Sequence, residues 1–169
     1  MGQIRKVDVP AGSLLAQFGP AGAYRDCFCQ EIDGPATLEQ FVEHFYSSWA
    51  FTPERIALAV IDRGASTEDA RRLAYGETDI FAMWKVVERR QHELLLQDFR
   101  GATATWLSVQ PGEVTFPDGD DADDPQGRMV RQTHTRLLFG SWVGRPERRV
   151  VKALMPFHRW YSRMLLAGV

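Results

Sequence analysis

Apolar side chains recur at every second position through most of residues 79–143, and this pattern constrains the fold more than any other feature of the chain. The runs "DIFAMWKVVERR" and "ELLLQDF" are separated by a short turn, and "TATWLSVQ" and "RMVRQTHTRLLFGSWV" follow them. Because side chains alternate between the two faces of a strand, each run predicts a β-strand. Strands joined by short connections pair antiparallel. The sequence therefore predicts an antiparallel meander.

One strand and three helices are predicted ahead of the meander. Residues 23–32 alternate in the way that is typical of a strand. After it, "TLEQ" has the spacing of a helix capping box, "FTPERIALAVIDRG" opens with Thr-Pro and stops at glycine, and "STEDARRLAYG" repeats these signals. These boundaries predict helices that begin just after Thr37, Thr52 and Ser66.

The C-terminal segment predicts a long amphipathic helix from about Pro146 to Leu166. Its apolar residues fall at steps of three and four, and its Arg and Lys residues lie on the opposite side. Such a helix spans about 30 Å, enough to cross a small sheet. Pro156 is expected to kink it, because proline has no amide hydrogen and clashes with the preceding turn. Residues 145–169 carry six Arg or Lys and one Glu, a local charge of +5 in a chain of formal net charge −2.

The length of 169 residues predicts a single domain covering 1–169. Residues 118–127 hold five aspartates among Gly and Pro and are predicted to form an acidic mobile loop. They do not fit an EF-hand, because the positions for Gly and Glu are Asp123 and Met129. No apolar run is long enough to span a membrane and no secretory signal begins the chain, so a cytoplasmic location is expected. The small net charge argues against a nucleic-acid partner.

Cys27 and Cys29 are the only cysteines, and they lie two residues apart on a predicted strand. Neighbours on the same face of one strand rarely reach disulfide geometry, and no second Cys pair or nearby His completes a metal site. Two small buried side chains are the preferred interpretation. The chain has no P-loop, no dinucleotide-binding glycine motif and no H-E-x-x-H pair, so neither a cofactor nor a metal is expected.

The order of predicted elements resembles the helix-grip fold of the START-like and Bet v 1-like (SRPBCC) superfamily. More narrowly, "YRDCF", "VVERRQHELLLQDFRG" and "MPFHRWYSRMLL" resemble an uncharacterised bacterial family, whose domain also occurs fused behind short-chain-dehydrogenase-like domains. The matching segments cover about half of the chain, and residues 50–78 depart from the family's pattern. The resemblance implies an α+β fold in which a curved antiparallel sheet wraps on the long C-terminal helix. It also implies a cavity between them, and no particular reaction.

The candidate ligand-binding residues are those expected to face this cavity. They are Trp84, Trp106, His134, Leu154, Phe157, His158 and Tyr161. Large aromatic walls with a few polar groups favour a flat or hydrophobic ligand. The neighbours of His134 in register are partly polar, so its face is either solvent-exposed or the wall of a polar cavity.

His158 is the one candidate for catalysis, since it lies on the apolar stripe of the predicted C-terminal helix. A histidine partly removed from water can exchange a proton near neutral pH, but it can equally be a packed residue bonded to a carbonyl. Glu88, Glu93 and Asp98 lie on paired strands near several arginines. Cross-strand ion pairs are the preferred interpretation of these acids, ahead of a catalytic acid pair.

Three functions stay open from the sequence. The first is a protein that binds a small hydrophobic or aromatic molecule between sheet and helix. The second is a metal-free cyclase, hydratase or isomerase that uses a pocket His or acid. The third is an interaction protein that docks its basic C-terminal helix on an anionic surface. A homodimer is compatible with each of them.

Overall fold

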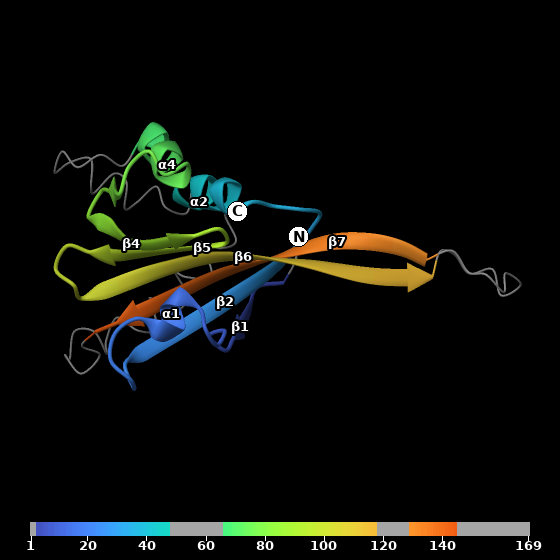
Figure 1. The fold of residues 1–169 in the computed structure, drawn as a ribbon, viewed down its shortest axis with the longest axis horizontal. Coiled ribbons are helices and arrows are strands. Elements are labelled where there is room, and N and C mark those ends of the chain that lie inside the picture. Colours follow the sequence, from blue (N-terminus) through green and yellow to red (C-terminus); the bar gives the residue numbers. More distant parts are fainter. Residues whose placement is uncertain (1–2, 48–65, 118–128, 145–169) are drawn as a thin grey trace, which may run out of the picture.

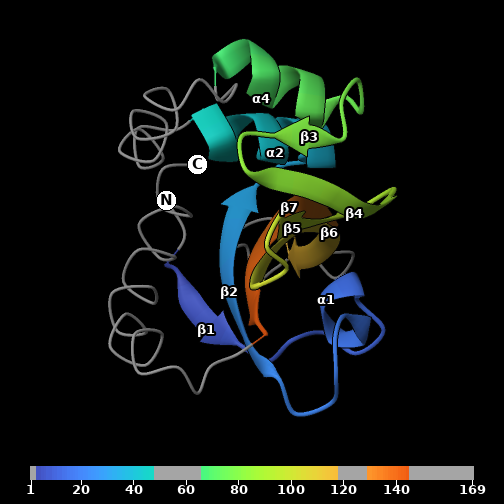
Figure 2. The ribbon, with the colours of Figure 1, turned by 90° about the vertical axis from the view of Figure 1, so that its left-hand side faces the viewer.

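The computed structural model describes residues 3–47, 66–117 and 129–144 of the chain. In these segments the fold is α+β, with a seven-stranded antiparallel sheet and short helices on both of its faces (Figure 1). The strands turn progressively along the sheet, so that β2 and β4 cross at a wide angle in Figure 2. Such a twist is the usual right-handed consequence of strand stereochemistry.

The strands confirm the predicted meander, except that "DIFAMWKVVERR" forms two antiparallel strands joined by a turn at residues 82–83 instead of one strand. They also add one short edge strand near the N-terminus. They are β1 (Arg5–Val7), β2 (Tyr24–Asp33), β3 (Ile80–Phe81), β4 (Trp84–Arg90), β5 (Glu93–Asp98), β6 (Thr103–Pro117) and β7 (Met129–Val143). Their order in the sheet is β1-β2-β7-β6-β5-β4-β3, and every neighbouring pair is antiparallel. The predicted strand at 23–32 is thus β2, and it lies beside β7 at the far end of the meander.

Two of the three predicted helices lie in the described segments. They are α2 (Leu38–Ser47) and α4 (Thr67–Ala74). The predicted capping box of α2 is present, because Thr37 N donates to Gln40 Oε1 at 3.0 Å and Gln40 N donates to Thr37 Oγ1 at 3.3 Å. Ser66 and Asp69 form the same reciprocal pair at the start of α4. The helix predicted after Thr52 lies outside the described residues.

The helix α1 (Leu14–Gln17) was not predicted, and the contacts that hold it are tertiary. Its N-cap Ser13 accepts a hydrogen bond from Ala16 N at 3.2 Å. The Arg25 guanidinium of β2 donates to Leu15 O at 3.0 Å and also to Phe18 O. A helix of four residues cannot be stable by itself, so these bonds from the sheet explain why it forms.

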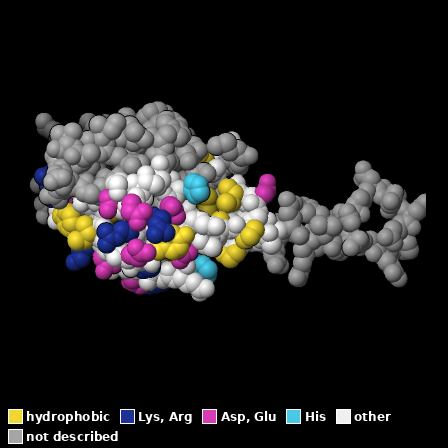
Figure 3. Space-filling view, turned by 90° about the horizontal axis from the view of Figure 1, so that it is seen from above, with side chains coloured by type: hydrophobic (Ala, Val, Ile, Leu, Met, Phe, Trp, Pro, Cys, Tyr) yellow, Lys and Arg dark blue, Asp and Glu magenta, His cyan; other side chains and the backbone are white. Residues whose placement is uncertain are grey.

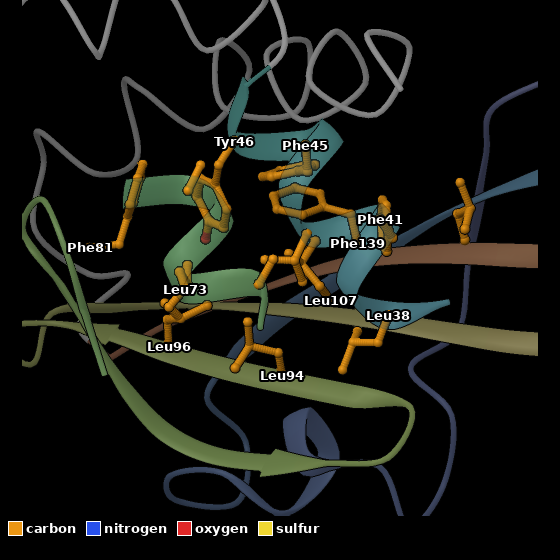
Figure 4. Packing of buried hydrophobic residues seen from close by; sticks show 14 of the residues in the cluster. Leu38, Phe41, Phe45, Tyr46, Leu73, Phe81, Leu94, Leu96, Leu107 and Phe139 are labelled. Carbon is orange, nitrogen blue, oxygen red and sulfur yellow. The ribbon is translucent and has the colours of Figure 1, made fainter. Parts of the chain in front are cut away.

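We call the side of the sheet covered by α2 and α4 the α2 face, and it carries the larger core (Figure 4). There Phe139 of β7 stacks on Phe45 of α2 with ring centroids 5.1 Å apart. The buried members are Phe28, Leu38, Phe41, Val42, Phe45, Tyr46, Ala70, Leu73, Ala74, Phe81, Ala82, Leu94, Leu96, Leu107, Val109, Leu137 and Phe139. The buried residues of α2 recur at helical spacing, so one hydrophobic face of the helix covers the sheet.

The opposite side, the α1 face, carries a second core beneath α1. Its buried members are Leu14, Leu15, Cys27, Cys29, Leu95, Ala104, Trp106, Leu138 and Trp142. A Cβ placed on Gly140 would contact Leu15 Cδ2 and lie 3.0 Å from Trp106 Cε3, so only glycine lets α1 and the indole approach β7 this closely. With both faces covered, β7 is buried without a break from Leu137 to Val143.

Two further predicted elements fall outside the described residues. They are the long C-terminal helix and the acidic loop at 118–127. Within the described segments, no helix has the length and apolar character that crossing a membrane requires. In the view of Figure 3, the acidic and basic side chains of described residues lie intermixed.

Candidate functional site

The two tryptophans predicted to share a cavity lie on opposite faces of the sheet. Trp84 is half-buried and packs against the core of the α2 face. Trp106 is fully buried in the core of the α1 face, where its Nε1 donates to Glu93 Oε2 at 2.8 Å. One molecule bound to a single face cannot contact both side chains. Trp84 therefore stays a candidate ligand contact, whereas the contacts of Trp106 are those of a core residue.

His134 also lies away from Trp84. Its side chain points to the α1 face, as that of Leu138 does, because the two residues are four positions apart on one regular strand, β7. Its half-buried ring lies over Gly112, where an added Cβ would come within 2.5 Å of both Cε1 and Nε2. Beside it, Arg136 Nε lies 3.9 Å from Glu31 Oε1 in a partly exposed ion pair. His134 is thus part of a polar surface on the face opposite Trp84.

The other four predicted ligand contacts lie outside the described residues. They are Leu154, Phe157, His158 and Tyr161. Of the three described members, the structure brings no two together, and Trp84 is the one that borders the larger core.

The three carboxylates of the meander have mixed roles. Arg90 contacts Glu93 across the β4–β5 hairpin at 3.9 Å, as predicted, but it contacts Glu88 of its own strand at 2.9 Å. Asp98 accepts hydrogen bonds from the backbone N–H groups of Arg100, at 2.7 Å, and Thr103, so it stabilises the turn after β5. The cross-strand interpretation was right for Glu93 and wrong for Glu88 and Asp98.

A buried polar cluster on the α2 face was not predicted. Asp26 of β2 lies directly opposite Ser141 of β7, which lies opposite Thr105 of β6. Asp26 is 1% exposed and Ser141 is 3% exposed. Tyr24, two residues before Asp26, donates its hydroxyl hydrogen bond to Asp26 Oδ2 at 2.9 Å. The cluster thus places a carboxylate and three hydroxyls on β2, β7 and β6, close to the end of the sheet at which β2 and β6 begin and β7 ends.

Two atoms of this cluster lack hydrogen-bond partners among the described residues. Asp26 Oδ1 and Ser141 Oγ are buried, and neither has a partner in the part of the chain that the structure describes. Buried side-chain polar atoms are paired in the great majority of cases, so each exception calls for an explanation by a ligand, a water or a chemical role. Two such atoms on directly opposed residues, with Cβ atoms about 5 Å apart, form one locus.

The cluster continues into apolar side chains along a row across the sheet. Thr105 lies opposite Leu96 of β5, and Leu96 lies opposite Val86 of β4. We call these five residues the Asp26 row: Asp26, Ser141, Thr105, Leu96 and Val86. The row is polar at its β2 and β7 end and apolar at its β5 and β4 end. Trp84 lies two positions from Val86 and so on the same face at the apolar end.

The sequence contained a signal for this cluster. The alternation of "YRDCFCQEI" already placed Tyr24 and Asp26 on the face of Phe28, and a charged residue between aromatic ones on a buried face is unusual. No local motif marks Ser141, because "GSW" lacks the G-x-S-x-G pattern of a nucleophile elbow. What the sequence could not supply is the register that places Asp26 opposite Ser141.

The two cysteines have the properties of core residues. Cys27 and Cys29 are both buried on the α1 face and form no disulfide. Burial raises the pKa of the Cys27 thiol from 9.0 to about 12, with smaller contributions from Cys29 and Asp26. A thiol in that state is neither a good nucleophile nor a good metal ligand. Within the described segments, no three His, Cys, Asp or Glu side chains gather closely enough to hold a metal ion.

No protein-family model, no curated protein and no solved structure matches this chain. Function is therefore argued from the Asp26 row and the surrounding fold.

Proposed function

We propose that this protein binds a small hydrophobic or aromatic molecule on the α2 face of its sheet. The observation that carries the proposal is the pair of buried, unpartnered polar atoms, Asp26 Oδ1 and Ser141 Oγ, at the end of an apolar row. Leaving a buried hydrogen-bonding atom unsatisfied costs about 1–3 kcal/mol, and more for a charged group. A ligand group that bonds to these atoms recovers that free energy on binding.

The apolar end of the Asp26 row supports a mainly hydrophobic ligand. Leu96 and Val86 lie in line with the polar pair, and Trp84 adds an aromatic surface beside them. Burial of apolar surface contributes about 25 cal/mol per Å², which makes such contacts the main source of affinity. Ligand sites of this kind combine an apolar lining with a few polar groups that fix orientation.

The fold supports a START-like helix-grip protein as the framework of this site. A long strand, helices and an antiparallel meander follow each other in the order that the resemblance implies. We propose that the C-terminal segment is the gripping helix on the α2 face, with Leu154, Phe157, His158 and Tyr161 facing the ligand. This extension uses the amphipathic pattern of the sequence.

A thermal-shift screen against fatty acids, polyketides and polycyclic aromatic compounds tests the proposal. A ligand at one hundred times its Kd stabilises the folded state by about 2.7 kcal/mol, which raises Tm by about 5 °C or more for a chain of this size. Trp84→Ala should weaken binding about tenfold. The control is Val87→Ala, since Val87 is exposed on the same strand. A core that an experimental structure shows to be filled solid would contradict the proposal.

A second candidate is a metal-free enzyme of the cyclase, hydratase or isomerase type. It is favoured by the hydrogen bond between Tyr24 and Asp26, because a carboxylate with one free oxygen can accept a proton from a bound substrate. Asp26→Asn should then lower kcat much more than it changes KM. A ligand that is recovered chemically unchanged after long incubation with the protein would rule this candidate out in favour of a carrier. His158 remains the predicted alternative acid or base for such a reaction.

A further inference from the structure

The geometry points to a narrower ligand class, namely apolar molecules that carry a hydroxyl group, either an alcohol or a phenol. We infer that the ligand hydroxyl donates a hydrogen bond to Asp26 Oδ1 and accepts one from the Ser141 hydroxyl. This inference rests on the proposed function, because it specifies the polar end of a ligand whose apolar end the row already favours.

The hydrogen-bonding capacities of the two side chains carry the argument. An ionised carboxylate only accepts, and Oδ2 of Asp26 already accepts from Tyr24 at 2.9 Å, so Oδ1 is the oxygen that needs a donor. The Ser141 hydroxyl has one proton to donate and lone pairs that accept. A group that satisfies Asp26 Oδ1 and also takes the Ser141 proton must therefore donate to the first side chain and accept from the second.

A hydroxyl meets both requirements through one oxygen atom. The two residues lie directly opposite each other on neighbouring strands, which brings their Cβ atoms to about 5 Å, so one ligand atom can bond to both side chains. Ethers, ketones and esters only accept, so they leave Asp26 Oδ1 without a donor. An ammonium group only donates, so it leaves the Ser141 proton without an acceptor.

The row also sets the orientation of the molecule. Across the sheet, the residue next to Ser141 is Thr105, which is half-buried. The residue next to Thr105 is Leu96, whose side chain lies in the core. A hydroxyl at Asp26 therefore directs the rest of the ligand over Thr105 and Leu96, toward β4, which carries Val86 and Trp84. Adjacent strands are about 4.8 Å apart, so the apolar body begins within two strand spacings of the hydroxyl.

The test uses three naphthalene compounds that differ only in their polar group: 2-naphthylmethanol, 2-(methoxymethyl)naphthalene and protonated 2-naphthylmethylamine. Isothermal titration of the full chain at pH 7 should give a Kd for the alcohol about 10- to 100-fold lower than for the ether, since a hydrogen bond to a charged group is the difference. Ser141→Ala and Asp26→Asn should each bring this ratio close to one. Unfolding midpoints of both variants establish that they fold.

Ser108→Ala is the matched control. Ser108 is also a buried serine of a central strand, at 2% exposure, but it lies next to Leu107 on the alternate side of β6 and therefore on the α1 face. The alcohol-to-ether ratio should survive this substitution. Should Asp26→Asn fail to fold, Ser141→Ala alone carries the comparison with Ser108→Ala.

Each other outcome has a definite meaning. Equal affinities for alcohol and ether in the unaltered protein overturn the hydroxyl inference and leave the proposed apolar site standing. Tighter binding of the ammonium compound overturns it in favour of a cationic ligand. A preference for the alcohol that persists in Ser141→Ala and Asp26→Asn overturns the assignment to these residues. Failure of all three compounds to bind contradicts the proposed function itself, and the inference with it.

Discussion

Replacing Glu93 with alanine should destabilise the protein far more than replacing its neighbour Glu88. Glu93 Oε2 accepts two hydrogen bonds, from Trp106 Nε1 and from Leu14 N, each at 2.8 Å. Its side chain is 18% exposed, whereas that of Glu88 is 50% exposed and contacts only the exposed Arg90 among the described residues. One carboxylate therefore joins the β5–β6 hairpin to the start of α1.

The expected loss of stability follows from the hydrogen-bonding groups that Glu93→Ala leaves without their partner. A hydrogen bond to a charged group contributes about 1.5–3 kcal/mol, and the indole N–H of fully buried Trp106 would be left without a partner. The hydrogen bond from Leu14 N is only part-buried, so water can replace its acceptor. Glu93→Ala should therefore lower the free energy of unfolding by about 3–5 kcal/mol. Glu88→Ala removes an exposed ion pair and should cost less than about 1 kcal/mol.

Urea unfolding followed by tryptophan fluorescence and circular dichroism measures both differences. A change of 3 kcal/mol corresponds to about 6–12 °C in Tm for a chain of this size. The Trp106→Phe background removes the indole donor, so Glu93→Ala should cost about 1.5–3 kcal/mol less there. Equal effects of Glu93→Ala and Glu88→Ala, or an unchanged effect of Glu93→Ala in the Trp106→Phe background, would refute this account of how α1 is held.

Three further outcomes are expected. Gly140→Ala should cost about 1–3 kcal/mol, because its Cβ contacts Leu15, and a neutral effect in urea unfolding would contradict the close packing. Cys27 should resist iodoacetamide at pH 8.5 in the native protein and react after unfolding, as mass spectrometry can show. Because the Cys27 pKa rises to about 12 on folding, the unfolded thiol ionises first, and stability should fall as pH rises above 9.0. Ser66→Ala should cost about 1 kcal/mol. Hydrogen bonds from Ser66 lower the pKa of Asp69 below 3.8. The contribution of Asp69 to stability is therefore present above pH 3.8 and is lost as pH falls through the lower folded pKa. In Ser66→Ala, urea unfolding measured at several pH values should show a smaller loss of stability on the acid side.

The long elements were predictable from the sequence because their residues repeat at a fixed period. Alternation over many residues identified β2 and the meander, and capping signals at Thr37 and Ser66 identified α2 and α4. β1 has three residues and α1 has four, which is too short for any period to be visible. Both form because the sheet supplies partners, as Arg25 does for the carbonyls that follow Leu15.

The site was less predictable because it depends on which strands are neighbours. Alternation shows that Trp84 and Val86 point to the same face of the sheet. It cannot show whether Trp106, which is on another strand, points to that face as well. The register of β4, β5 and β6 decides this, and it separates the two tryptophans. The same register brings together Asp26 and Ser141, residues 115 positions apart that no local pattern connects.

The position of β2 beside β7 also determines the order in which the chain can fold. Strands β3 to β7 each pair with the strand next in sequence, so that part can form from local contacts. β2 must wait for β7, and the bonds that close this pairing join residues 99 and 101 positions apart, from Ala36 N to Thr135 Oγ1 and from Thr135 Oγ1 to Gly34 O. During synthesis, the apolar side chains of β2 therefore emerge long before their partner strand. Long-range pairing of this kind slows folding and leaves a strand edge open to other chains, so we expect the nascent protein to need a chaperone until β7 has left the ribosome.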